Sequence, residues 1–152
     1  MYSITLDECV SLGIVSPYTI YCKPVSLTAT EKDEYKKVHN QFLYYKYKLG
    51  QFDAFNEAKR ILASKSAGPA EKQSAVQFYR CIRQRKKIVD FASNKITEFQ
   101  KLVLKNIDKK ILSFSGANEF TDQMCAAVDP LSVTYHSKKT KKQRDKALED
   151  FK

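Results

Sequence analysis

Glycine and proline are scarce in this sequence, and long apolar runs are absent. Only four of the 152 residues are Gly and four are Pro, which excludes fibrous and low-complexity proteins. No stretch of 18 residues is free of charge, so the sequence offers no candidate membrane span. The first ten residues lack the basic and apolar regions of a secretory signal. We therefore expect a protein of the cytoplasm, or one that lies with DNA in a nucleoid or nucleus.

The cysteines and histidines form no pattern that is typical of a metal site or a disulfide framework. No Cys-x-x-Cys pair is present, and His39 and His136 lie far apart in the sequence. We expect reduced thiols, mostly buried, because nothing indicates secretion. We also expect no metal and no catalytic residue, with either histidine as a general base being the weakest option. The four cysteines are Cys9, Cys22, Cys81 and Cys125.

Positive charge is the strongest compositional feature. The chain has 27 Lys and Arg against 17 Asp and Glu, a formal net charge of +10. This excess predicts a polyanionic partner, for which nucleic acid is the default. For the two basic clusters, phosphate contact and a solvated helix face both remain open. The first cluster holds Arg80, Arg83, Arg85, Lys86 and Lys87, and the second holds Lys138, Lys139, Lys141, Lys142, Arg144 and Lys146.

Residues 28–107 are predicted to be helical. A capping box at Thr28–Glu31 begins a helix that we expect to end before Gly50. A second helix is predicted at 52–64, and a long amphipathic one from Pro69 to about residue 106.

Aromatic residues alternate with lysines near the end of the first of these helices. Tyr44, Tyr45 and Tyr47 surround Lys46 and precede Lys48. Such interleaving is compatible with stacking on nucleobases, and also with core packing on one face and solvated lysines on the other.

The two ends of the chain predict strands as well as helices. Residues 18–27 favour an edge strand, because Pro24 cannot donate a ladder hydrogen bond. After residue 107, strands are predicted at 110–115 and 131–135, with a helix at 118–128 between them and a capped helix from Thr140. This alternating order predicts an α/β fold with an incomplete parallel sheet. We divide the chain into 1–27 (linker and edge strand), 28–107 (helical insert) and 108–152 (α/β part).

The spacing in the last part carries a family likeness. A strand, a helix, and a second strand ending in His136 are followed by Arg144, Leu148 and Phe151 at eight, twelve and fifteen residues after that histidine. This stretch resembles the opening of the second RecA-like lobe of superfamily 2 helicases. In that family a Gly follows the histidine, and many RNA-helicase relatives carry Gln where this chain has Lys141; here Ser137 takes the place of the Gly.

The N-terminal part agrees with this likeness. Residues 7–18 and 25–35 resemble the segment after motif III in the branch of XPB-like, UvsW-like and restriction-subunit helicases. The resemblance implies a partial RecA-like lobe with a helical insert, from a DNA helicase that uses ATP and Mg²⁺. No Gly-x-x-x-x-Gly-Lys-Ser/Thr motif is present, so we expect no cofactor in this chain alone and no ATPase activity. A separate chain carrying the ATPase lobe would then be a partner.

The activity that we expect to remain is binding of a nucleic-acid backbone, with DNA as the expected partner and RNA as the alternative. Phe114 occupies the motif IV position, where it would pack beneath the ATP-site arginine of a complete helicase or simply in the core. Thr140 has a plain helix cap and Arg144 a salt bridge as alternatives to phosphate binding. The predicted nucleic-acid contacts are Ser137, Lys138, Thr140, Lys141, Arg144, Arg83, Arg85 and Lys86.

Two other functional classes stay open. The chain is also compatible with a small basic nucleic-acid-binding or helicase-interacting protein, of phage or viral type, without enzymatic activity. A pure interaction module, whose unfinished sheet edge pairs with another chain, is the other possibility. Salt-dependent DNA binding separates these two classes.

Overall fold

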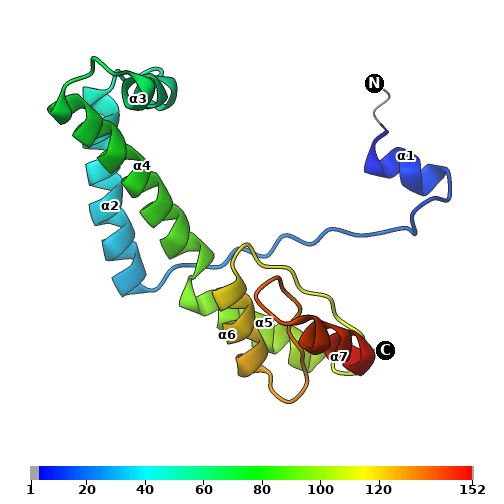
Figure 1. Cartoon of the computed structure of the whole chain (residues 1–152). Coiled ribbons are helices and arrows are strands. Elements are labelled where there is room, and N and C mark those ends of the chain that lie inside the picture. Colours follow the sequence, from blue (N-terminus) through cyan, green and yellow to red (C-terminus); the bar gives the residue numbers. More distant parts are fainter. Residues whose placement is uncertain (1–3, 152) are drawn as a thin grey trace.

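The computed structural model describes residues 4–151, and these residues form helices joined by turns and extended segments (Figure 1). The helices, in chain order, are α1 (Leu6–Ser11), α2 (Ala29–Lys48), α3 (Ala54–Ala63), α4 (Pro69–Asp90), α5 (Ser93–Lys105), α6 (Asn118–Ala127) and α7 (Lys141–Phe151). Within residues 4–151 there is no strand.

The predicted parallel RecA-like sheet is therefore wrong. Residues 18–27, 110–115 and 131–135 are not helical, but none of them pairs with a neighbouring segment. Their sequences favour extended backbone, whereas a parallel sheet also needs several strands side by side and cover on both faces. Three isolated extended segments among small helices supply neither condition.

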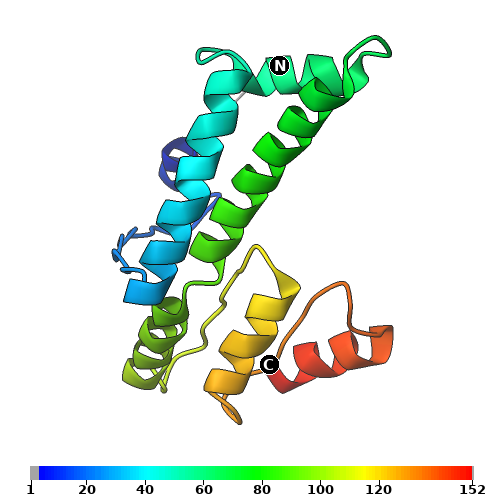
Figure 2. The ribbon, with the colours of Figure 1, turned by 90° about the vertical axis from the view of Figure 1, so that its left-hand side faces the viewer.

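A helical hairpin, formed by α2 and α4, is the most extensive packing in the chain, and α3 crosses its closed end (Figure 2). Ala58 on α3 and Ala75 on α4 are both 0% exposed, and such small side chains allow the two helices to approach closely. Phe42 of α2 stacks on Phe78 of α4 with 5.3 Å between ring centroids. The buried cluster at this end of the hairpin is Leu49, Ala54, Ala58, Ile61, Ala75 and Phe78.

Local signals set both ends of α2, as the sequence predicts. The Glu31 N–H donates to Thr28 Oγ1 at 3.3 Å, and the Thr28 N–H donates to Glu31 Oε2 at 2.8 Å. The turn after α2 uses Gly50 at φ 91°, a left-handed conformation that glycine adopts without steric cost.

The predicted long helix from Pro69 to about residue 106 is two helices. The chain leaves helical geometry at Ala92, with φ −56° and ψ 122°, and α5 begins at Ser93. The Ser93 N–H and hydroxyl both donate to Glu31 Oε1 at 2.8 Å, so a carboxylate from α2 caps α5. Glu31 and Ser93 are 62 residues apart in the sequence, so the local periodicity of the sequence does not predict this cap.

The C-terminal helices form a second, smaller group. α5 packs on α6, where Phe91 meets Phe120 edge to face at 5.5 Å and Gln100 Nε2 donates to the Ala127 carbonyl at 2.5 Å. α6 starts and ends close to its predicted positions, and α7 begins where the capping box at Thr140 predicts. In Figure 1, α1 and the extended segment after it run away from the other helices.

Candidate functional site

The excess of positive charge lies almost entirely on the helical part of the chain. Residues 28–107 contain 17 Lys and Arg against 8 Asp and Glu, whereas the two ends together contain 10 against 9. A binding surface for a polyanion is therefore to be sought first on the hairpin and its neighbours.

One face of α4 carries a row of unpaired cations. Arg80, Arg83 and Lys87 follow one another at intervals of three and four residues, which places them on one side of the helix, away from the buried Phe78 and Cys81. All three are exposed. Within residues 4–151 none of them forms an ion pair with a carboxylate. We call Arg80, Arg83 and Lys87 the α4 basic face.

Arg85 belongs to the same sequence cluster but points into the hairpin. Its Nη2 and Nε donate to the Tyr35 hydroxyl at 2.9 and 3.3 Å. Its guanidinium also lies 4.4 Å from the centroid of the Phe42 ring. Arg85 therefore stabilises the contact between α2 and α4 and is not placed to meet a ligand, whereas Lys86 is exposed.

An open groove of about 660 Å³ runs between α2 and α4 beside this face, and Arg80 belongs to both. The groove is lined by four side-chain amides, two cations and a single carboxylate, together with the apolar surface of one valine and two tyrosines. Its lining residues are Glu34, Lys37, Val38, Asn40, Gln41, Tyr44 and Tyr45 from α2, and Gln77, Arg80 and Gln84 from α4.

The three interleaved tyrosines of α2 have different surroundings, so neither sequence interpretation holds for all of them. Tyr45 packs against the buried cluster. Tyr44 lines the groove and is 55% exposed, and Tyr47 is 77% exposed outside it. Lys48 Nζ lies over the Tyr44 ring, 4.8 Å from its centroid, and the proximity of Tyr44 raises the pKa of Lys48.

At the C-terminal cluster, Thr140 forms the predicted helix cap. The Gln143 N–H donates to Thr140 Oγ1 at 3.3 Å, and Gln143 Oε1 accepts from the Thr140 N–H at 2.9 Å. Ser137 and Lys141 are exposed near this first turn of α7, and Arg144 is half-buried. The cap thus occupies the Thr140 hydroxyl.

Other cations of this cluster already have acidic neighbours. Lys138 Nζ lies 3.9 Å from Glu119 Oε1, and Lys139 Nζ lies 3.4 Å from Asp122 Oδ1. His136 Nε2 lies 3.1 Å from the same Asp122 oxygen. The hydrogen bond with His136, followed by that with Lys139, lowers the pKa of Asp122. Compared with the α4 basic face, this cluster is partly neutralised.

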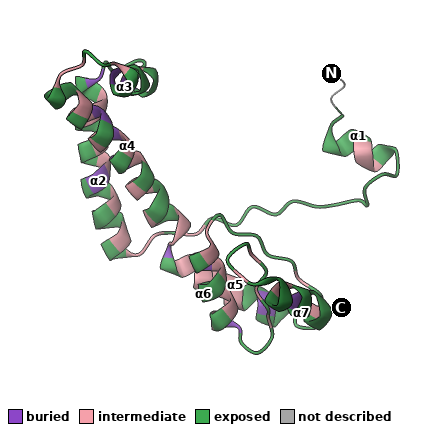
Figure 3. Ribbon diagram, in the orientation of Figure 1, coloured by how far each residue is buried: buried purple, intermediate pink, exposed green. Residues whose placement is uncertain are grey.

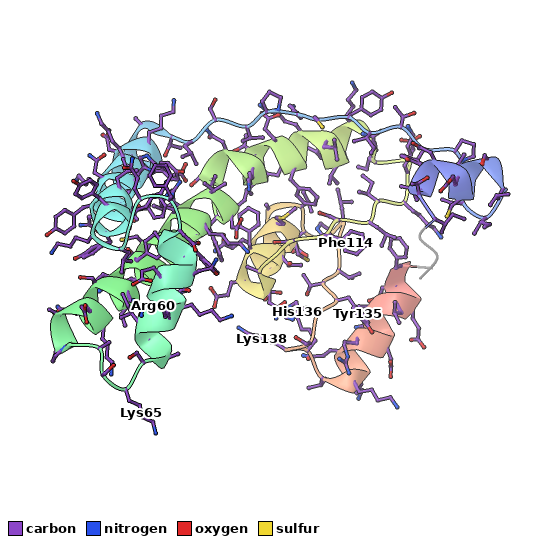
Figure 4. All side chains as sticks on the ribbon, turned by 90° about the horizontal axis from the view of Figure 1, so that it is seen from above. Arg60, Lys65, Phe114, Tyr135, His136 and Lys138 are labelled. Atoms are coloured by element: carbon purple, nitrogen blue, oxygen red, sulfur yellow. The ribbon has the colours of Figure 1, made fainter. Side chains whose placement is uncertain are left out.

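Phe114 is 90% exposed, so the interpretation of this residue as part of the core is wrong. Figure 4 shows Phe114 on the connection before α6 and Tyr135, His136 and Lys138 on the connection before α7.

The expectation of mostly buried thiols is also wrong, because only Cys81 is buried, and this burial raises the pKa of its thiol. Within residues 4–151 no cysteine is in a disulfide.

No group of three or more His, Cys, Asp and Glu side chains among residues 4–151 is arranged to hold a metal ion. In the same range, no helix combines the length and the apolar character that a membrane crossing requires.

Comparison of the chain with protein-family models, with curated proteins and with solved structures finds no match. The resemblance to a helicase lobe stays a prediction from sequence motifs, and the sheet that it implied is missing from residues 4–151. The surface chemistry of the hairpin is therefore what indicates a function.

Proposed function

We propose that this chain binds nucleic acid through the phosphate backbone, using the α4 basic face and the groove beside it, without an enzymatic reaction of its own. The observation that carries the proposal is the row of three exposed cations without ion pairs, next to a groove lined by amides. This proposal corresponds to the simpler of the functions that the sequence predicts, which is that of a small basic nucleic-acid-binding protein.

The spacing of the α4 basic face suits a row of phosphates. With a rise of about 1.5 Å per residue, the seven steps from Arg80 to Lys87 span about 10 Å along the helix. A strand of B-form DNA carries one phosphate per roughly 3.4 Å of helix axis, so this row faces about three of them. Each neutralised phosphate releases a counterion, which makes the affinity fall with salt.

The amides of the groove add contacts that need no charge. Asn40, Gln41, Gln77 and Gln84 each present two N–H donors and a carbonyl acceptor. Side-chain amides commonly hydrogen-bond phosphate and sugar oxygens, and such contacts fix the position of a strand without reading its sequence. We therefore expect binding with little sequence preference.

The test is fluorescence anisotropy with labelled single- and double-stranded DNA over a range of salt concentrations. The variant R80E/R83E/K87E reverses the α4 basic face. The control K65E/K105E/K109E makes the same change in net charge at exposed lysines outside both basic clusters; Lys65, for example, projects from the loop between α3 and α4 (Figure 4).

We expect the α4 variant to lose more than tenfold in affinity at low salt. Its slope of log affinity against log salt should become shallower by about 2 to 3, because three phosphate contacts are lost. The control variant should lose only the small part of the DNA affinity that is due to the overall charge of the chain. No binding by the wild-type chain at low salt, or equal losses in the two folded variants, would contradict the proposal.

The C-terminal cluster is tested in the same assay with K141E/R144E. Because Lys138 and Lys139 already have acidic neighbours, we expect a smaller loss than for the α4 variant. A loss as large as that of the α4 variant would move the main contact to α7, as the sequence motifs predict.

A further inference from the structure

Tyr44 is the one aromatic ring that both lines the groove and remains largely exposed. The ring is 55% exposed although Tyr45 meets it edge to face at 5.1 Å between centroids. The Lys48 ammonium covers the ring 4.8 Å from its centroid. A ring that contacts two neighbours, Tyr45 and Lys48, and is still 55% exposed can stack with a second flat group.

The surroundings of this ring match the edges of a nucleobase. Gln41, Gln77 and Gln84 offer donors and acceptors in the same groove, and Glu34 offers an acceptor for an exocyclic amino group. Lys37 and Arg80 place a cation on each of the two helices that border the groove, where the flanking phosphates would lie. A flat aromatic surface, amides and cations are thus combined within one site.

The groove has room for a nucleobase, and stacking on Tyr44 requires that this base be unpaired. Its volume of about 660 Å³ lies within the range of small-molecule sites, which is about 300–1,000 Å³. A base inside a duplex is covered on both faces by its neighbours, so its faces cannot reach Tyr44. Only a base that is free of its partner can enter.

Given the function proposed above, on which this inference rests, we propose that the groove between α2 and α4 binds an unpaired nucleobase stacked on Tyr44. The chain then prefers single-stranded to double-stranded nucleic acid. Stacking provides the preference, and the α4 basic face provides the affinity that both forms share.

The experiment compares one labelled oligodeoxynucleotide with the same strand annealed to its complement, at fixed salt, for four proteins: wild type, Tyr44→Ala, Tyr44→Phe and Tyr47→Ala. Tyr47 is the matched control, since it is an exposed tyrosine of the same helix outside the groove. Tyr44→Phe keeps the ring and therefore separates stacking from the hydroxyl.

We expect Tyr44→Ala to weaken single-strand binding about tenfold, to leave duplex binding within twofold and to keep the salt slope. Tyr44→Phe and Tyr47→Ala should resemble the wild type. With 2-aminopurine in the strand, wild type and Tyr44→Phe should quench its emission, and Tyr44→Ala should not. The chain contains no Trp, so the probe is read against a low background.

Different binding results would contradict the nucleobase site and the proposed function. Equal affinity for single strand and duplex, or an equal loss in folded Tyr44→Ala and Tyr47→Ala, overturns the nucleobase site while salt-dependent binding remains. No salt-dependent binding of either form overturns the proposed function and the inference together. Circular dichroism of each variant confirms that the helices are intact.

Discussion

Arg83 and Arg85 are two positions apart, but the structure gives them different environments. Arg83 is exposed on the α4 basic face, whereas Arg85 donates to the Tyr35 hydroxyl and lies over Phe42. A helix turns by about 100° per residue, so neighbours in one basic cluster face different directions. Composition therefore overestimates how many of these cations meet a ligand.

This difference gives a prediction for a pair of alanine variants. Arg85→Ala should lower the free energy of unfolding by about 1–3 kcal/mol, because a hydrogen bond by a charged group and a cation–π contact are both lost. Its DNA affinity should change less than twofold. Arg83→Ala should do the reverse, with weaker binding and a change of less than about 0.5 kcal/mol in unfolding. Urea denaturation and anisotropy on both variants check this, and a destabilised Arg83→Ala with full affinity would contradict it.

Glu31 links the hairpin to the start of the C-terminal helices. Its carboxylate accepts from the Ser93 N–H, the Thr28 N–H and the Ser93 hydroxyl, each at 2.8 Å. These hydrogen bonds, led by the one from the Ser93 N–H, lower the pKa of Glu31 to about 2. The folded chain therefore binds this proton less readily than the unfolded chain.

The lowered pKa of Glu31 predicts a pH dependence. The stabilisation by Glu31 is fully present above its unfolded pKa of about 4.5 and is lost as the pH falls toward 2. Glu31→Gln should cost about 0.5–2 kcal/mol at pH 7, the usual range for a lost cap. The difference in the free energy of unfolding between wild type and variant should decrease as the pH falls from 5 to 2. Urea denaturation at several pH values measures it, with Asp33→Asn on the exposed side of α2 as control. A gap that is constant with pH would count against this role.

At the scale of elements, close contact between α3 and α4 depends on alanines. Ala75→Leu should lower the free energy of unfolding by about 1–3 kcal/mol, because its added methylenes have no space at a site that is 0% exposed. Ala70→Leu, at an exposed position of the same helix, is the control and should be nearly neutral. Thermal denaturation of the two variants tests this, and equal effects would show that α3 does not pack tightly on α4.

The extended elements lack what makes a strand stable. Along 131–135, the large apolar side chains of Leu131, Val133 and Tyr135 are exposed, while Ser132 bonds to Cys125 of α6 at 3.1 Å. Figure 3 shows the connections before α6 and α7 as mainly exposed. With no partner strand in residues 4–151, their backbone amides have little protection.

This predicts fast exchange in the extended elements. Amides of 111–115 and 131–135 should exchange with deuterium at close to unprotected rates, whereas those in the buried stretch of α4, around Ala75 to Cys81, should be protected. Hydrogen exchange read by mass spectrometry on the whole chain measures both. Strong protection of the two extended segments would mean that they pair as strands in solution.

At the scale of the whole molecule, the chain exposes more surface than a compact globule. Its accessible surface is 12169 Å², whereas a compact monomer of 17.5 kDa exposes roughly 7,900 Å². The reason is the arrangement of two helical groups that share little helix-on-helix packing, with long extended connections. Such a shape presents much charged surface relative to its small core.

Small-angle X-ray scattering tests the shape directly. A compact domain of this length has a radius of gyration of about 15 Å, and we expect a clearly larger value at concentrations where the chain is monomeric. A value near 15 Å would show that the hairpin and the C-terminal helices fold onto each other. We expect the same radius of gyration at high salt, because the arrangement of the helices, and not repulsion between charges, keeps the chain extended.

The sequence by itself determined the features that are written in neighbouring residues. The capping boxes at Thr28 and Thr140 begin helices as predicted, Gly50 follows the end of α2, and the charge excess of the helical part can be counted directly. Caps and turns depend on hydrogen bonds between residues three or four positions apart, so their outcome is local.

Only the tertiary structure decided the remaining features. It capped α5 with a carboxylate from α2, turned Arg85 inward and Arg83 outward, and left the extended segments of residues 4–151 unpaired. It also formed the groove from residues on two helices that are distant in the sequence. Each outcome depends on which distant segments come into contact, and the period of a single helix or strand does not contain that information.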